Sequence, residues 1–139
     1  MSEVCILNHS LLTHKITLLR DETTDVRDFR QLLHEVSTLI CYEATKDLPL
    51  VDKTVKTPIC ETVGKVMKNQ PVLVPILRAG LGMMEPFINV IPAAKVGHIG
   101  LARNHETLEP EEYYCNLPAD ISEREVILLD PMLATGGSG

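Results

Sequence analysis

The stretch that decides the fold is Val126-Ile-Leu-Leu-Asp130-Pro-Met-Leu-Ala-Thr135-Gly-Gly-Ser-Gly139. Its first four residues are apolar and lie between charged residues and turn formers, which is typical of a buried central strand in a parallel sheet. After Asp130 the side chains become small, and the glycines let the backbone turn tightly enough to point several N–H groups at one anion. Because ligands of open α/β sheets bind at the carboxyl ends of the strands, this stretch predicts a phosphate-binding loop.

The glycine-rich stretch matches neither of two common phosphate-binding motifs. A Walker loop requires a lysine directly after its second glycine, and none follows Gly136 or Gly137. The dinucleotide motif is approached at Gly80-Leu-Gly82, but Glu85 occupies its third small position. The acid before the loop points to another ligand, because Asp130 can accept hydrogen bonds from vicinal hydroxyls, as acidic residues do at ribose sites. An acid followed by an anion-binding turn predicts a ribose phosphate.

The composition limits the classes of function. The 139 residues form one domain at most, and 13 basic against 19 acidic residues give a net charge of −6, which argues against nucleic acid as the main partner. The sequence predicts neither a membrane span nor a signal peptide, and therefore a cytoplasmic protein. The cysteines and histidines are widely spaced, so we expect reduced thiols and no structural metal site.

Three helices are predicted in the first half of the chain, and the first of them is capped by Asn8 and carries Leu11, Leu12, Ile16 and Leu19. Apolar residues recur at helical spacing from Val26 to Ile40, with Asp25 and Asp28 at the positive end, and this pattern predicts a helix that packs on a sheet. Thr57-Pro58, a cap followed by proline at the first helical position, predicts another helix. Its expected buried stripe consists of Ile59, Val63, Val66 and Met67.

The second half of the chain alternates between strand and helix patterns. Strands are predicted over residues 72–77 and 94–101, with a helix over 83–91 between them. A charged hairpin or lid is expected over 103–117, with Tyr113 and Tyr114 packed at its base. Strands that alternate with helices indicate right-handed crossovers, so the predicted fold is α/β with a parallel sheet and flanking helices.

Two arginines follow apolar strands directly, as Asp130 does. Arg78 and Arg103 would therefore project from the same edge of a parallel sheet as Asp130. The planar guanidinium binds phosphate oxygens in pairs, which suits it to a diphosphate leaving group. The backbone of Ala79-Gly80, without bulky side chains, could donate N–H groups to the same diphosphate.

Several stretches of the sequence, in addition to these strand ends, resemble a known family. Asp130-Pro-Met-Leu-Ala-Thr-Gly-Gly-Ser138 is similar to the phosphoribosyl-diphosphate loop of uracil phosphoribosyltransferases, in which a proline follows the acid. Pro75-Ile-Leu-Arg78-Ala-Gly-Leu-Gly82, Ile91-Pro-Ala-Ala-Lys-Val-Gly-His-Ile-Gly100 and Glu112-Tyr-Tyr114 also look like that family, in its order. The resemblance covers nearly the whole chain and implies a type I phosphoribosyltransferase-like fold with a hairpin lid.

The resemblance implies a glycosyltransferase reaction of pyrimidine salvage. Uracil phosphoribosyltransferases transfer the phosphoribosyl group of 5-phospho-α-D-ribose 1-diphosphate (PRPP) to N1 of uracil, and release UMP and diphosphate. The resemblance also implies a cytoplasmic homodimer, a possible purine nucleotide effector, and a nucleotide-binding site that takes Mg²⁺ through the phosphates of PRPP, with no direct metal ligand from the chain. Neither nucleic acid nor a membrane is an expected partner.

The resemblance assigns contacts with PRPP and implies no catalytic nucleophile or base. The matching residues of the family bind the diphosphate, the ribose hydroxyls and the 5-phosphate. In this sequence the expected PRPP-binding residues are Arg78, Ala79, Gly80, Arg103, Asp130, Pro131, Met132, Leu133, Ala134, Thr135, Gly136, Gly137 and Ser138.

The sequence departs from the family pattern at its end and around Arg103. Family members continue past the loop into a helix, further strands and a pyrimidine-binding segment, so residues 1–139 are expected to form a single, C-terminally incomplete phosphoribosyltransferase domain. Leu101-Ala102-Arg103-Asn104 lacks the usual aromatic residue before the arginine and the usual acid after it. Two functions therefore stay open at this point: the uracil phosphoribosyltransferase itself, or a non-catalytic PRPP-binding or regulatory fragment without the uracil site.

Overall fold

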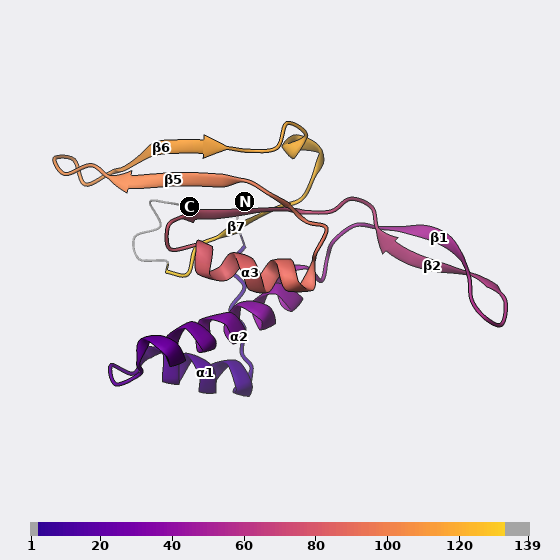
Figure 1. Cartoon of the computed structure of the whole chain (residues 1–139), viewed down its shortest axis with the longest axis horizontal. Helices are drawn as coiled ribbons and strands as arrows, with labels where there is room; N and C mark the ends of the chain where they lie inside the picture. The colour runs from indigo at the N-terminus through magenta and orange to yellow at the C-terminus, as the bar shows by residue number, and fades with distance from the viewer. Residues whose placement is uncertain (1–2, 133–139) are drawn as a thin grey trace.

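Strand β3 (Val72–Leu77) lies at the centre of the sheet. In the computed structural model, which describes residues 3–132, β3 pairs in parallel with β7 (Val126–Leu129) along one edge. Along its other edge it pairs in parallel with β4 (Lys95–Val96) and then with β5 (His98–Arg103). Strand β6 (Pro110–Asn116) joins β5 in antiparallel direction (Figure 1). The predicted α/β fold with a parallel sheet is confirmed.

Two of the predicted strands differ in detail from the structure. The expected strand over 94–101 is divided at Gly97, whose N–H still donates to the Leu73 carbonyl at 2.9 Å, so β4 and β5 follow one line along β3. Strand β7 was predicted as a buried central strand, but among the described residues it pairs only with β3. Its side chains Val126 and Leu128 are 47% and 45% exposed, since nothing described covers that face of the strand.

Three helices accompany the sheet, namely α1 (Ser10–Arg20), α2 (Val26–Ala44) and α3 (Leu81–Val90). Helix α2 begins as predicted, because the Asp25 carboxylate accepts the N–H of Asp28 at 2.8 Å and caps the first turn. Helix α1 is held against α2 by an ion pair of 2.6 Å between Lys15 and Glu35, and this lysine lowers the pKa of Glu35.

The hydrophobic core lies between the sheet and helices α2 and α3. Leu73 and Leu129 of the two paired strands pack with Phe87 of α3 and Cys41 of α2, and all four are at most 2% exposed. Burial raises the pKa of the Cys41 thiol, which keeps it protonated and unreactive. The core therefore fixes the two helices under the centre of the sheet (Figure 1).

The first turn of α3 comes unusually close to the strand ends. A Cβ atom at Gly80 would lie 2.3 Å from the Leu129 carbonyl oxygen and 2.7 Å from the Ile76 nitrogen. The Gly80 N–H donates to the Ile76 carbonyl at 2.8 Å, which turns the chain sharply from β3 into α3. Only glycine fits between these backbone atoms, so Gly80 is a packing requirement of the fold.

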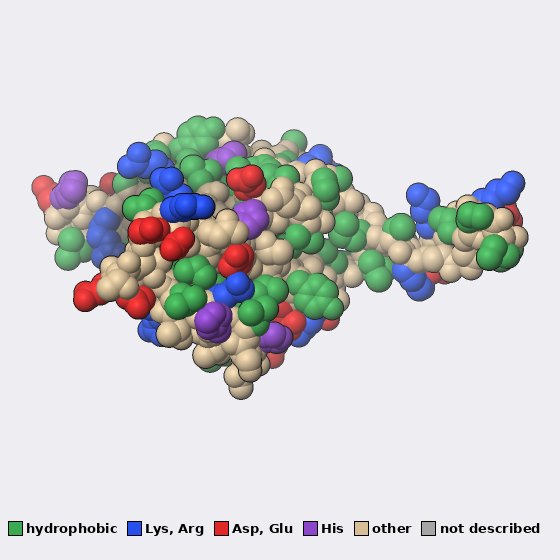
Figure 2. Space-filling view, turned by 60° about the horizontal axis from the view of Figure 1, so that its bottom comes forward, with side chains coloured by type: hydrophobic (Ala, Val, Ile, Leu, Met, Phe, Trp, Pro, Cys, Tyr) green, Lys and Arg blue, Asp and Glu red, His purple; other side chains and the backbone are tan. Residues whose placement is uncertain are grey.

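The predicted helix over residues 57–67 is wrong. Strands β1 (Leu50–Lys56) and β2 (Glu61–Met67) form an antiparallel hairpin there, which we call the arm. It projects from the body (Figure 1), and Figure 2 shows it standing clear with hydrophobic and basic side chains on its surface. The side chains of the expected buried stripe Ile59, Val63 and Val66 are 94%, 62% and 40% exposed.

Local chemistry explains why the arm is extended instead of helical. The Thr57 hydroxyl accepts the N–H groups of Ile59 and Cys60 and donates to the Cys60 carbonyl at 2.8 Å, so it closes a turn and does not cap a helix. Val51 and Val66 then face each other across the two strands. Such β-branched pairs stabilise a hairpin, and their spacing in the sequence also fits a helix face.

A polar cluster ties together the amino ends of the strands. The Arg124 Nε donates to Asp120 at 2.8 Å, and its Nη1 donates to the Gln70 carbonyl at 2.8 Å directly before β3. Lys95 at the start of β4 reaches the same carboxylate at 3.2 Å. Arg124 and then Lys95 lower the pKa of Asp120. The cluster therefore links β3, β4 and the approach to β7.

We predict that Asp120→Asn makes the protein less sensitive to acid. Because the pKa of Asp120 is lower in the folded protein, its stabilising contribution is complete above the ordinary pKa of about 3.9 and is lost as the pH falls through the lower, folded value. The free energy of unfolding, measured by urea titration from pH 6 to pH 3, should fall less steeply in the variant. The charge-matched control is Asp52→Asn on the arm, and equal slopes for Asp120→Asn and wild type would contradict the prediction.

We predict that Gly80→Ala destabilises the fold by about 3 kcal/mol, because the added methyl group collides with backbone atoms that cannot move aside cheaply. The measurement is urea-induced unfolding followed by circular dichroism. The control is Gly64→Ala on the arm, where an added Cβ meets nothing within 4 Å. Equal losses in the two variants would show that the close approach is unimportant.

Candidate functional site

The structure places the three predicted strand-end residues at one edge of the sheet. Leu129 pairs with Pro75, so Asp130 is level with Ile76, and Arg78 follows directly after the last residue of β3, two residues beyond Ile76. Gly100 of β5 pairs with Leu77, and Arg103 follows three residues later. At about 3.3 Å per residue, Arg103 therefore lies about 10 Å beyond the end of β3, measured along the strand.

All three residues are available to a ligand. Arg78, Arg103 and Asp130 are exposed, and no ion pair involves any of them within residues 3–132. Among the described residues, the Asp130 carboxylate accepts the N–H of Met132 at 3.3 Å and no other. Two cations and one carboxylate on neighbouring strands can bind a phosphorylated ligand that also carries hydroxyl groups.

The β3–α3 turn uses one of the two amides that were expected to face the diphosphate. The amide of Gly80 was expected to face the diphosphate, but it is used in the hydrogen bond to Ile76. Among the described residues, the Ala79 N–H makes no backbone hydrogen bond, and Ala79 is exposed. The turn occupies the Gly80 N–H and leaves the Ala79 N–H without a backbone partner, so the Ala79 N–H is the one donor of this pair that a ligand can reach.

The predicted hairpin over 103–117 forms from β5 and β6 and extends past the sheet (Figure 1). Its tip is organised by Asn104, whose side-chain oxygen Oδ1 accepts the N–H groups of Glu106 and Thr107 at 2.8 and 2.9 Å. The Asn104 amide donates to Glu111 at 2.6 Å. Leu108 has a φ of 61°, a conformation that is unfavourable for leucine and marks the turn. Arg103 is thus held at the base of a closed turn.

A β-bulge joins the hairpin to the sheet. Gly100 pairs with Tyr114, whereas the next residue, Leu101, pairs with Glu112, so Tyr113 has no partner across the ladder. The Tyr113 ring covers Gly100, where a Cβ would lie 2.6 Å from two ring carbons. Both tyrosines were expected to pack at the hairpin base; Tyr113 makes this contact, but it stays 59% exposed and Tyr114 stays 45% exposed. The bulge itself gave no sequence signal that we recognised.

The phosphate loop is described only at its start. Pro131 and Met132 are exposed residues that follow Asp130. Leu133, Ala134, Thr135, Gly136, Gly137 and Ser138, which we expect to hold the 5-phosphate, lie outside the described residues.

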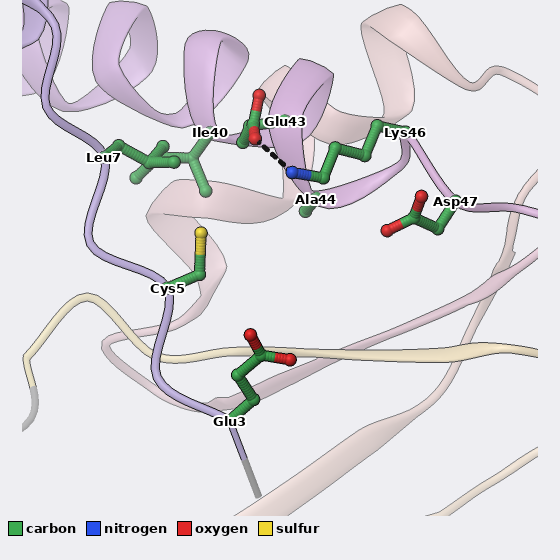
Figure 3. A pocket seen from close by; sticks show the side chains of 8 residues that line it. All are labelled: Glu3, Cys5, Leu7, Ile40, Glu43, Ala44, Lys46 and Asp47. Carbon is green, nitrogen blue, oxygen red and sulfur yellow. Dashed lines mark hydrogen bonds and ion pairs between the residues drawn. The ribbon is translucent and has the colours of Figure 1, made fainter.

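A cavity elsewhere has the wrong chemistry for a phosphorylated ligand. It measures about 400 Å³ and lies between the N-terminal segment and the carboxyl end of α2 (Figure 3). Glu3, Glu43 and Asp47 line it, and its one cation, Lys46, is paired with Glu43 at 2.7 Å. The negative end of the helix dipole adds to these carboxylates. This cavity would repel phosphate, so the strand edge remains the candidate site.

Two classes of feature are absent from the part of the chain that the structure covers. Residues 3–132 contain no group of three histidine, cysteine, aspartate or glutamate side chains that could hold a metal ion. None of the helices in this range is long and apolar enough to cross a membrane.

The chain is similar to known proteins along almost its whole length. A family model described as uracil phosphoribosyltransferase matches residues 6–139. The uracil phosphoribosyltransferase of Finegoldia magna is 56% identical over 99% of this chain, and that of Clostridioides difficile is 55% identical over 99% of it. The solved structure of the AQ2163 protein from Aquifex aeolicus superimposes with a TM-score of 0.86 at 43% identity, over 95% of this chain and 64% of that one.

The chain spans 66% of the length of both curated relatives. The matched region includes the two strand-end arginines, the hairpin and the acid before the glycine-rich stretch. On the family match and on identity of this extent, the chain belongs to the uracil phosphoribosyltransferase family.

Proposed function

We propose that the protein acts as a uracil phosphoribosyltransferase, which makes UMP and diphosphate from uracil and PRPP in pyrimidine salvage. The observation that carries the proposal is the convergence of Arg78, Arg103 and Asp130, all exposed, at the carboxyl edge of three parallel strands. The curated relatives bear the name of this activity.

Electrostatic stabilisation is the chemistry that these residues supply. As the bond between ribose and diphosphate breaks, negative charge grows on the leaving group and positive charge grows on the ribose. Arg78 and Arg103 would hold the diphosphate oxygens in pairs, and the free N–H of Ala79 would add one donor. Asp130 would accept hydrogen bonds from the ribose hydroxyls and orient the sugar. No nucleophilic side chain is needed.

We include Mg²⁺ in the proposal as a cofactor carried by the substrate. Its support is the chemistry of the substrate, because the phosphate oxygens of PRPP are hard donors of the kind that Mg²⁺ prefers. Magnesium keeps several waters and is often held through substrate phosphates. When bound, it would neutralise part of the diphosphate charge.

We further propose that the protein assembles as a homodimer through the arm. A two-stranded hairpin is at best marginally stable alone in water, and every residue of β1 is exposed. Val51, Val55, Val63 and Val66 are each 37% to 62% exposed, and a second copy could bury them. A cytoplasmic location agrees with the four free cysteines. A purine nucleotide effector is proposed from the family resemblance alone.

The PRPP site is tested by titration calorimetry on the whole chain. Arg103→Gln and Asp130→Asn should each weaken PRPP binding at least tenfold, because each removes a charge-assisted hydrogen bond worth about 1.5–3 kcal/mol. The control is Arg20→Gln, an exposed arginine in the last turn of α1. UMP formation with uracil is measured in parallel. Unchanged PRPP affinity in both site variants would contradict the proposed site.

The assembly is tested on the arm. Val51→Lys combined with Val66→Lys places two charges on a cross-strand pair and should shift sedimentation equilibrium from dimer to monomer. The control is Leu128→Lys on β7, which is about as exposed at 45% and is not part of the arm. A dimer that survives the arm substitutions would contradict the proposed contact.

A further inference from the structure

Arg103 lies on the part of the hairpin that extends past the other strands (Figure 1). Strand β5 pairs with β3 at Ile99 and Gly100, whereas the residues from Leu101 to Arg103 pair only with β6 among the described residues. A two-stranded ladder is at best marginally stable by itself in water. The position of the Arg103 guanidinium therefore depends on how firmly the end of this ladder is closed.

The hydrogen bond that closes the ladder is made by the residue after Arg103. Pro110, the ladder partner of Arg103, has no N–H to donate. The Asn104 N–H donates to the Glu109 carbonyl at 2.8 Å, and the Asn104 carbonyl accepts the Leu108 N–H at 2.9 Å. The backbone of Asn104 thus joins the two ends of the turn.

The Asn104 side chain uses its oxygen and its nitrogen for different partners. Oδ1 accepts the N–H groups of Glu106 and Thr107, and Nδ2 donates to Glu111 Oε1 at 2.6 Å. An ionised carboxylate at this position could accept in the same way, but it has no hydrogen to donate to Glu111. Although the tip is exposed, Asn104 itself is half-buried, and its backbone and side-chain polar groups are all bonded within the hairpin.

The bond to Glu111 belongs to the face of the hairpin opposite to Arg103. Ala102 and its partner Glu111 point to one face, and Arg103 and Pro110 point to the other, since side chains alternate along a strand. Within residues 3–132 the Arg103 guanidinium takes part in no ion pair. The bond between Asn104 and Glu111 therefore fixes the ladder end while the guanidinium stays free for phosphate oxygens.

We infer that Asn104 is a positioning residue for PRPP binding, which acts through Arg103 and needs the hydrogen bond to Glu111. The inference rests on the proposed PRPP site and adds to it a residue that contacts neither the phosphates nor the ribose. Arg103 binds phosphate oxygens in pairs only when its planar fork is aimed at them, so a loose ladder end costs affinity. A closed turn also reduces the entropy that is lost when the arginine is ordered by the ligand.

The test is titration calorimetry with PRPP and Mg²⁺ on the whole chain. Asn104→Asp keeps the acceptor for Glu106 and Thr107 but sets a carboxylate against that of Glu111, and it should weaken binding about fivefold. Adding Glu111→Gln to this variant supplies an amide hydrogen for the new carboxylate and restores the net charge of the wild type. The affinity should then return to within about twofold of wild type.

The charge control is His105→Asp, which adds one negative charge directly beside Asn104. His105 is exposed and is not among the hydrogen-bond partners of the Asn104 side chain. Because salt screens an exposed charge, the affinity should change by less than about twofold at 0.15 M salt. A loss as large as that in Asn104→Asp would show that added charge causes the effect, and it would overturn the inference.

A double-mutant cycle shows whether Asn104 acts through Arg103. In the chain that carries Arg103→Gln, Asn104→Asp should cause no further loss of affinity, because no guanidinium is left to position. The inference is overturned if Asn104→Asp causes no loss, if it causes equal losses with and without Arg103, or if Glu111→Gln fails to restore binding. Unchanged PRPP affinity in Arg103→Gln alone would overturn the proposed PRPP contact of Arg103 together with the inference.

Discussion

The close approach of Gly80 to two strands is the constraint on which the rest of the structure depends. Its Cα lies directly against the Leu129 carbonyl and the backbone of Ile76, so α3 starts immediately beneath the ends of β3 and β7. This contact holds Arg78, two residues earlier, at the same edge of the sheet as Asp130, which follows Leu129. The same turn sets α3 against α2 and closes the core around Phe87. Because Gly80 has no side chain, the candidate site and the hydrophobic core can share this one turn.

Much of the site could be predicted from the sequence because strand ends leave clear signals. Apolar runs that stop at Arg78 and Asp130 place both residues at one edge as soon as the sheet is parallel. The arm could not be predicted, since Thr57-Pro58 and the valines of β2 fit a helix start and an apolar helix face as well as a hairpin. Two features of the structure favour the hairpin over the helix. The Thr57 hydroxyl bonds to the Cys60 carbonyl and closes a turn. No described surface covers the apolar residues of 61–67, which a helix would have to bury.

Other features depend on contacts between distant residues, which single-sequence patterns do not carry. The exposure of β7 follows from its having one partner strand among the described residues, although its four apolar residues resemble those of a central strand. The involvement of the Gly80 amide with Ile76 follows from the turn geometry.

The bulge at Tyr113 determines on which face of the hairpin each β6 side chain lies. Side chains in a strand alternate between two faces, and one inserted residue reverses that alternation for everything beyond it. Tyr114 pairs with Gly100 and Glu112 with Leu101, so these two β6 residues, two apart in sequence, lie on opposite faces. The unpaired Tyr113 therefore determines which β6 residue pairs with Arg103, and that residue is Pro110. If Tyr113 instead paired with Leu101 without a bulge, each β6 residue from Glu112 back to Pro110 would move to the other face of the sheet.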